Sequence, residues 1–258
     1  MVSEIRLSKR LTAIADMVNA SRPAQGGTDG EYCLCDVGTD HAHIPIRLLM
    51  EGRIDSAIAM DVIEGPLEKA RENIERYGVA ERVILRLSDG LDAYEAGEAS
   101  GLVIAGMGGR IMRKILLREP HKSLDFGELI LQPQADPEFV RSAVRALGLS
   151  IDYEKIVLED NKYYPVMHVT HDPVKGPDWD GSEADRDLYQ DTEDLFGPVL
   201  LRTRDPMLKS YLLWQKGVND RILHSLLNAN RTSPSVNEKR EQIMRKDLLI
   251  RTALGRYL

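Results

Sequence analysis

Cysteines are scarce in this chain, and long apolar runs are absent from it. The only two cysteines, Cys33 and Cys35, lie two residues apart in a predicted strand. Their side chains would point to the same face, and a disulfide between them would distort the strand, so we expect reduced thiols in a cytoplasmic protein. No run approaches the roughly 18 apolar residues that cross a bilayer. Charged residues interrupt positions 1–18, which excludes the apolar core of a signal peptide, and we expect no membrane partner.

Positive charge is also in short supply, except near the C-terminal end. The formal net charge is -7. Residues 201–258 contain 12 Lys/Arg and 5 Asp/Glu, whereas the preceding 200 residues contain 22 and 36. A basic end on an acidic body is expected if that end contacts a polyanion.

Apolar strands alternate with amphipathic helices over the first 170 residues. The alternation and the short loops predict a doubly wound α/β sheet with an antiparallel hairpin at one edge. We predict strands at 32–37, 56–61, 83–87, 102–105, 129–132, 151–158 and 163–170, and helices at 5–18, 44–50, 65–77, 110–117 and 137–147.

The composition changes after residue 171. Nine acidic residues fall between positions 172 and 194, and prolines and glycines favour a loop in the first half of this interval. Two helices follow, at 205–230 and 235–257, with apolar residues near a 3.5-residue repeat that predicts an antiparallel hairpin or two-stranded coiled coil. We therefore expect three parts, which are a cofactor-binding domain at 1–171, an acidic linker at 172–200 and a helical domain at 201–258.

A tight turn after the first strand is the strongest functional signal. Gly38 allows the backbone to turn sharply and a ligand to approach closely. Asp61, followed by Val62, closes the next strand 23 residues later, near the spacing of a ribose-binding acid in dinucleotide folds. The pattern predicts a nucleotide-containing cofactor at the carboxyl ends of the strands. The alternative is an ordinary α/β turn with a solvated carboxylate.

Asp40 narrows the choice of cofactor. In nicotinamide-type loops, a second glycine near this position admits a pyrophosphate, which a carboxylate would repel. An aspartate in place of this glycine argues against NAD and FAD. It favours S-adenosylmethionine, which has an adenosine, a sulfonium and an amino acid but no phosphate. Asp40 could instead cap the following helix.

Further candidates lie at the ends of the other strands. Asp36 could bind a cofactor amine or hold the loop, and Asp89 with Gly90 could accept from the adenine amino group. The small residues from Gly106 to Gly109 would leave room for a closely packed ligand or substrate base.

His41 and His43 flank the same turn, but their spacing is poor for tetrahedral metal ligation without further donors, so we predict no metal. No Ser-His-Asp or Walker pattern stands out.

The basic residues of the C-terminal helices are candidates for contact with the phosphates of a folded RNA. The alternative is a solvated helix face. The cations that we single out as candidates for substrate contact are Lys209, Lys216, Arg240 and Lys246.

Five motifs are informative in combination. They are Leu7-Ser8-Lys9-Arg10-Leu11, Asp36-Val37-Gly38-Thr39-Asp40-His41-Ala42, Gly106-Met107-Gly108-Gly109, Leu131-Gln132-Pro133 and the hairpin from Glu159 to Tyr164. Together they resemble the bacterial TrmK family, from about Ile5 to the end of the chain. That family consists of S-adenosylmethionine-dependent tRNA (adenine-22-N1)-methyltransferases.

The resemblance implies a class I methyltransferase domain with a C-terminal coiled-coil domain that helps to hold tRNA. It implies that Arg10 faces the methionine carboxylate, that Asp61 binds the ribose and that Asp89 binds the adenine. Gly38 would line the cofactor, and Asp40 would lie near the target base as the catalytic residue. The positions implied to border the reaction centre and the substrate are Gly106, Met107, Gly108 and Gly109, with His43 standing where relatives often have tyrosine.

The expected reaction is therefore methyl transfer to N1 of an adenine in tRNA by a protein that we expect to be a monomer. Two alternatives remain open at this point. One is a non-catalytic RNA-binding protein that retains the cofactor pocket, and the other is a methyltransferase that acts on a small molecule.

Overall fold

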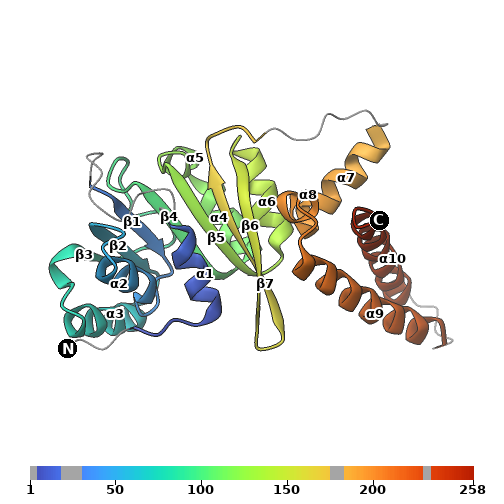
Figure 1. The fold of residues 1–258 in the computed structure, drawn as a ribbon, viewed down its shortest axis with the longest axis horizontal. Coiled ribbons are helices and arrows are strands. Elements are labelled where there is room, and N and C mark those ends of the chain that lie inside the picture. The colour runs from blue at the N-terminus through green and yellow to red at the C-terminus, as the bar shows by residue number, and fades with distance from the viewer. Residues whose placement is uncertain (1–4, 19–30, 175–182, 229–233) are drawn as a thin grey trace. The chain divides into compact units, whose positions relative to one another are not determined.

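The computed structural model describes residues 5–18, 31–174, 183–228 and 234–258. The chain divides into two compact units, Met1–Lys175 and Gly176–Leu258, which are described separately below. The first unit contains a seven-stranded sheet, and the second contains helices (Figure 1).

The strand order of the sheet is β3-β2-β1-β4-β5-β7-β6. Strands β1 to β5 are parallel, and β7 runs antiparallel to both β5 and β6. This confirms the predicted doubly wound sheet with its edge hairpin. The strands are β1 (Cys33–Val37), β2 (Ser56–Asp61), β3 (Val83–Leu87), β4 (Gly101–Gly108), β5 (Glu128–Ala135), β6 (Ser150–Glu159) and β7 (Lys162–Thr170).

Helices cover both faces of the sheet (Figure 1). Helices α1, α2 and α3 pack on one face through a shared apolar cluster. Helices α4 and α6 contact each other and the strands β4 and β5. The helices of this unit are α1 (Lys9–Met17), α2 (His43–Met50), α3 (Glu64–Arg76), the 3₁₀ turn η1 (Ala80–Arg82), α4 (Gly109–Arg118), α5 (Pro120–Ser123) and α6 (Pro137–Ala146).

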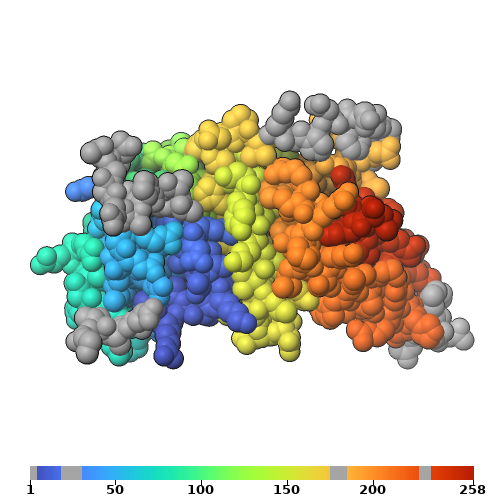
Figure 2. Space-filling view, in the orientation of Figure 1, coloured from blue at the N-terminus to red at the C-terminus, as the bar shows by residue number. Residues whose placement is uncertain are grey.

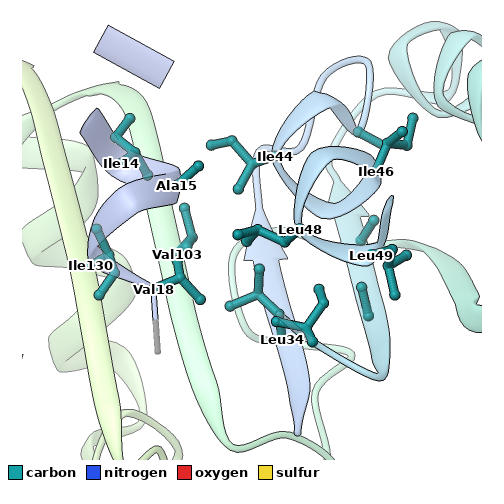
Figure 3. Close-up of a cluster of buried hydrophobic side chains, with 14 of the residues drawn as sticks. Ile14, Ala15, Val18, Leu34, Ile44, Ile46, Leu48, Leu49, Val103 and Ile130 are labelled. Atoms are coloured by element: carbon teal, nitrogen blue, oxygen red, sulfur yellow. The ribbon is translucent and has the colours of Figure 1, made fainter. Parts of the chain in front are cut away.

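One apolar cluster joins α1 and α2 to the sheet (Figure 3). Ile14 of α1 and Leu48 of α2 are both 0% exposed, and they meet Leu34, Val103 and Ile130 from three neighbouring strands. Because strand side chains alternate between faces, the residues between these positions serve the core on the α4 and α6 side. Figure 2 shows α1, in dark blue, between α2 and the yellow β6–β7 hairpin, which are both elements that it contacts.

Helix α1 begins four residues later than predicted. Ser8 is its N-cap, and the Ser8 hydroxyl accepts a hydrogen bond from the backbone amide of Leu11 (3.3 Å). A serine at this position satisfies one of the free amides of the first turn, so the helix starts at Lys9 although the apolar periodicity extends to Ile5.

Strands β4 and β5 are longer than predicted. We expected β4 to end before Gly106 and Pro133 to stop β5, but the ladder continues through Met107 opposite Pro133 and Gly108 opposite Ala135. The register shifts on both sides of Met107. Proline has no amide to donate to a ladder, and an irregular pairing of this kind accommodates it.

The second unit consists of α7 (Glu183–Phe196), α8 (Pro198–Arg202), α9 (Pro206–Asn228) and α10 (Pro234–Gly255). The interval expected to be a linker, 172–200, contains α7 and most of α8. Phe196, Val199 and Leu200 are each at most 4% exposed. These buried apolar side chains explain why the interval forms helices although it is rich in acidic residues.

Helix α10 contacts both α9 and α7. Its buried residues include Ile243, Leu249, Ile250 and Ala253, a face wider than the narrow seam of a two-stranded coiled coil. The coiled coil therefore stays a prediction, whereas the pair of long helices is confirmed. Within the described residues, no helix combines the length and the apolar character that a membrane span requires.

Candidate functional site

A cavity of about 400 Å³ lies where the first, second and fourth strands end. This is the switch point of the sheet, because the chain order runs outward from β1 in one direction and from β4 in the other. The predicted site residues that line it are Arg10, Asp36, Gly38, Asp40, His43, Asp61, Val62, Asp89, Gly90, Gly106 and Met107.

The turn after β1 is held by the neighbouring strand. Gly38 has φ +73°, a left-handed conformation that favours glycine. The amides of Gly38 and Thr39 both donate to the carbonyl oxygen of Met60, each at 2.9 Å. An added Cβ at Gly38 would lie 2.2 Å from Cε of Met107, so the Met107 side chain packs directly across the turn.

Asp36 is a buried carboxyl at the end of β1. It is 3% exposed, and Thr39 Oγ1 donates to its Oδ2 at 2.6 Å. Burial raises the pKa of Asp36 to about 7, and the nearby charges of Asp61 and Asp40 act in the same direction, while the Thr39 hydrogen bond opposes them. Asp36 can therefore change its charge near neutral pH.

Asp61 is fixed by two backbone amides. Its Oδ2 accepts from the amide of Asp40 (3.2 Å), and its Oδ1 accepts from the amide of Ile63 (3.1 Å). Carboxylate oxygens have about four acceptor sites, so Asp61 can still receive hydroxyl donors from a ligand. The same carboxylate thus holds the β1–α2 turn and presents an acceptor to the cavity.

Asp40 has a left-handed backbone conformation, with φ +55°. Its side chain is 73% exposed, and its Oδ1 lies 3.3 Å from Nε2 of His41. The N-cap of α2 is Ala42, which makes no side-chain cap hydrogen bond, so Asp40 does not cap this helix. A non-glycine residue in this conformation is uncommon and costs free energy, which indicates that the turn itself is important for the site.

His43 lies at the start of α2, with its ring centroid 5.4 Å from that of His41. Burial lowers the pKa of His43, and the neighbouring His41 adds to this effect. His43 is therefore a neutral ring at the cavity edge at physiological pH.

Gln132 orients Arg10, and the sequence reasoning gave it no such role. Gln132 is 0% exposed, and its Oε1 accepts from Arg10 Nη1 (2.6 Å) and from the amide of Gly106 (3.3 Å). The guanidinium carbon of Arg10 also lies 5.6 Å from the centroid of the Tyr164 ring. A glutamine within an otherwise apolar strand is a sequence signal that could have indicated a buried polar contact.

Asp89 forms an ion pair with Arg118, a contact that was not predicted from the sequence. Arg118 Nη2 donates to its Oδ2 at 2.7 Å, and this bond lowers the pKa of Asp89. Gly90 has φ +66°, and an added Cβ would lie 2.9 Å from Ile115. The loop after β3 is therefore packed against α4 and presents Asp89 as a carboxylate that is already paired.

Gly109, which was expected with Gly108 to border the reaction centre, has a packing role in the structure, whereas an added Cβ on Gly108 would meet nothing within 4 Å. Gly108 is the N-cap of α4, and an added Cβ on Gly109 would lie 2.0 Å from the carbonyl oxygen of Asp136. This contact explains the glycine at position 109 without any ligand.

The four cations predicted to contact substrate lie on the helices of the second unit. Lys209 Nζ lies 5.7 Å from the centroid of the Tyr257 ring, and Lys216 pairs with Asp220 at 2.8 Å. Arg240 has a buried Nε without a hydrogen-bond partner among the described residues, and Lys246 is half-buried.

The charge of the cavity limits what it can hold. Among the described residues that line it, Arg10 is the one lysine or arginine, whereas four residues are aspartates. A diphosphate would meet little positive charge here, whereas a nucleoside that carries an amino acid would find an anion-binding arginine, hydroxyl acceptors and the apolar Val62 and Ile111. No group of three or more potential metal ligands occurs in the part of the chain that the structure describes.

A doubly wound sheet with an acidic, phosphate-excluding cavity at its switch point defines a class of protein, namely a Rossmann-like domain for a nucleoside cofactor. Comparison with known proteins makes this specific. The chain belongs to the family described as "Methyltransferase domain", which matches residues 7–167.

Similar proteins carry more specific names. The tRNA (adenine(22)-N(1))-methyltransferase of Bacillus subtilis is 30% identical over 166 residues, which span 64% of this chain and 66% of that protein. A putative tRNA (m1A22) methyltransferase from Streptococcus pneumoniae is 30% identical, with a TM-score of 0.77 over 96% of this chain and 100% of the other. The structure of that protein in complex with S-adenosyl-L-methionine is 31% identical, with a TM-score of 0.73 over the same shares. These likenesses confirm the resemblance to the TrmK family.

Proposed function

We propose that this chain transfers the methyl group of S-adenosylmethionine to N1 of an adenine in tRNA, at position 22 by likeness to its relatives. The observation that carries the proposal is the composition of the cavity, which combines Arg10 with Asp36, Asp61 and Asp89 and offers no cradle for phosphate. Arg10 would bind the methionine carboxylate, Asp61 the ribose hydroxyls and Asp36 the ammonium group. The cofactor supplies an electrophilic methyl group when it is bound.

The chain has little acid–base work to do in this reaction. N1 of neutral adenine has a lone pair and no proton, so N1 attacks the methyl carbon as the carbon–sulfur bond breaks. Positive charge develops on the adenine ring. A carboxylate at Asp40 would stabilise that charge and could accept a hydrogen bond from the exocyclic amine. The remaining contribution is positioning, which requires that the Watson–Crick edge of the target adenine is exposed first.

The test is transfer of labelled methyl groups to unmodified tRNA transcripts, with the modified base mapped by primer extension. N1-methyladenosine blocks Watson–Crick pairing, so a stop at one adenine in the D arm is the expected result. Cofactor binding without any transfer to RNA would overturn the proposal in favour of a non-catalytic RNA-binding protein. Transfer to small molecules alone would overturn it in favour of another substrate class.

Asp40 allows a sharper version of this test. We expect Asp40→Ala to lower kcat about 10²- to 10³-fold, the range for loss of one electrostatic contact to a developing charge. Cofactor affinity, measured by calorimetry, should be largely unchanged. Asp40→Asn keeps a hydrogen-bond acceptor without the charge, so intermediate activity would separate the two contributions. An equal loss of cofactor affinity in both variants would place Asp40 in the cofactor site instead.

A further inference from the structure

Helix α4 concentrates positive charge on an acidic unit. Its sequence, Gly-Arg-Ile-Met-Arg-Lys-Ile-Leu-Leu-Arg, contains four basic residues and no acidic residue. Residues 1–175 as a whole contain 21 Lys/Arg and 28 Asp/Glu. The charge of α4 is therefore opposite in sign to that of the unit around it.

Two of these cations have no acidic partner. Met112, Ile115 and Leu116 bury one side of the helix, whereas Arg113 and Lys114 are exposed on the other. Within the ranges that the structure describes, neither Arg113 nor Lys114 has a carboxylate oxygen within 4.0 Å. The charge of Lys114 lowers the pKa of Asp89 at longer range, but neither cation is held in an ion pair among the described residues.

The two ends of the helix differ from this middle part. Arg118 is taken up by Asp89 and Asp92, at 2.7 and 2.6 Å. Arg110 Nε lies 3.2 Å from Asp136, and its guanidinium carbon lies 4.0 Å from the centroid of the Phe139 ring. The Arg110 side chain nevertheless remains 71% exposed, so it is oriented by its neighbours while its outer nitrogens face solvent.

Helix α4 lies at the edge of the cavity, although none of its cations is among the residues that line it. Helix α4 begins directly after β4, whose carboxyl end forms part of the cavity wall. Ile111, on the first turn of α4, is 56% exposed and lines the cavity together with Ile115. An RNA chain bound beside the first turn of α4 would meet an apolar contact at Ile111, with Arg110 and Lys114 next to it on the helix surface.

We propose that Arg110, Arg113 and Lys114 form an RNA-contacting patch that binds the backbone phosphates beside the target nucleotide, while Ile111 packs against its nucleoside. This inference rests on the proposed function, because it takes the substrate to be RNA. RNA carries a phosphate next to each nucleoside, and these phosphates are the anionic partners that the cations of the patch would bind. Such contacts are independent of base sequence. The patch lies on the methyltransferase unit and adds to any contact made by the C-terminal helices.

The test compares full-length variants in tRNA binding and methyl transfer. Arg113→Ala/Lys114→Ala should raise the Kd and KM for unmodified tRNA roughly tenfold or more at moderate salt, with kcat at saturating tRNA largely unchanged. The slope of log Kd against log salt concentration should become shallower by about 0.7 to 0.9 for each phosphate contact that is lost. The control is Arg71→Ala/Arg76→Ala on α3, which removes the same charge from exposed residues of the same unit.

The outcomes separate this proposal from the proposed function. If the wild-type protein transfers no methyl group to tRNA, the proposed function fails. If the wild type is active and the α4 variant matches the control in tRNA affinity and salt slope, the patch proposal is overturned. Because Lys114 lies near Asp89, cofactor affinity is measured in parallel, and the single variant Arg113→Glu repeats the test with Lys114 intact. An unchanged tRNA Kd in Arg113→Glu would also contradict the patch.

Discussion

Three aspartates of the β1–α2 region have different surroundings and therefore different properties. Asp36 is buried and accepts a hydrogen bond from Thr39, Asp61 is bound by two backbone amides, and Asp40 is largely exposed. The first can change its charge near neutral pH, the second holds the turn, and the third remains available to a substrate.

The buried position of Asp36 predicts a pH dependence of cofactor binding. Burial raises its pKa to about 7, so the carboxyl is increasingly ionised as the pH rises from 5.5 to 7.5. If the ionised form binds the cofactor ammonium, affinity rises with pH by up to about tenfold per pH unit below 7. Calorimetry of S-adenosylmethionine binding should show this rise in the wild type and a flat profile in Asp36→Asn. The same slope in both proteins would contradict the assignment.

About half of the residues that line the cavity were predicted from the sequence, because glycine turns and acidic residues at strand ends are local patterns. The sequence did not predict how these residues are paired. Gln132 reaches Arg10 across 122 positions of the chain, and Arg118 reaches Asp89 across 29. Such contacts depend on which strands and helices become neighbours, and a local pattern does not contain that information.

At the scale of elements, predictions succeeded where apolar periodicity was strong and failed where tertiary packing decided the outcome. The alternation of strands and helices through β7 was predicted, but the extension of β4 and β5 past Pro133 was not. Pro133 has no amide hydrogen for the ladder, and the irregular pairing at Met107 lets the strands continue past it. Helix α7 was missed because its acidic composition resembles a loop, although Phe196 at its end is buried.

The junction between β4 and α4 provides a test of packing. In Gly109→Ala, the new Cβ would lie 2.0 Å from a backbone oxygen of Asp136, so the junction must shift. We expect a loss of about 1–3 kcal/mol in stability, measured by thermal or denaturant unfolding. Gly65→Ala is a matched control in the first turn of α3, where an added Cβ meets nothing within 4 Å. It should be neutral or stabilising by up to about 1 kcal/mol, and equal destabilisation of both variants would contradict the steric explanation.

The edge of the sheet contains a charged histidine that links three strands. His168 on β7 contacts Glu128 on β5 (2.8 Å) and Asp152 on β6 (2.6 Å). Burial alone would lower the pKa of His168, but these two carboxylates raise it to about 9. Its folded pKa therefore lies above its unfolded value.

This difference gives the pH dependence a definite sign. The stability that His168 contributes is fully present below its unfolded pKa of roughly 6.5, and it is lost as the pH rises through about 9. His168→Gln should therefore destabilise the protein more at pH 6 than at pH 9.5, as measured by denaturant unfolding. A difference from the wild type that does not change with pH would show that His168 is not charged in the folded state.

At the scale of the whole molecule, charge is divided between an acidic unit that contains the cavity and basic C-terminal helices. This division of charge was visible in the sequence. The exposed cations on α4 were not distinguished from other surface charge, because the lack of ion pairs at Arg113 and Lys114 is a property of the fold. The choice of cofactor rests on the composition of the cavity, which offers no cradle for phosphate, and the proposed RNA contact rests on the cations of α4.

The central claim is that N1 of one adenine attacks a methyl group in this cavity, and a single atom tests it. The measurement is labelled methyl transfer to a tRNA that carries 1-deazaadenosine at position 22, in which a C–H group replaces N1. We predict that transfer is lost while the Kd of this tRNA stays close to that of the unmodified transcript. Undiminished transfer to the 1-deaza substrate would contradict the account, because the methyl group would then be accepted by another atom or another nucleotide.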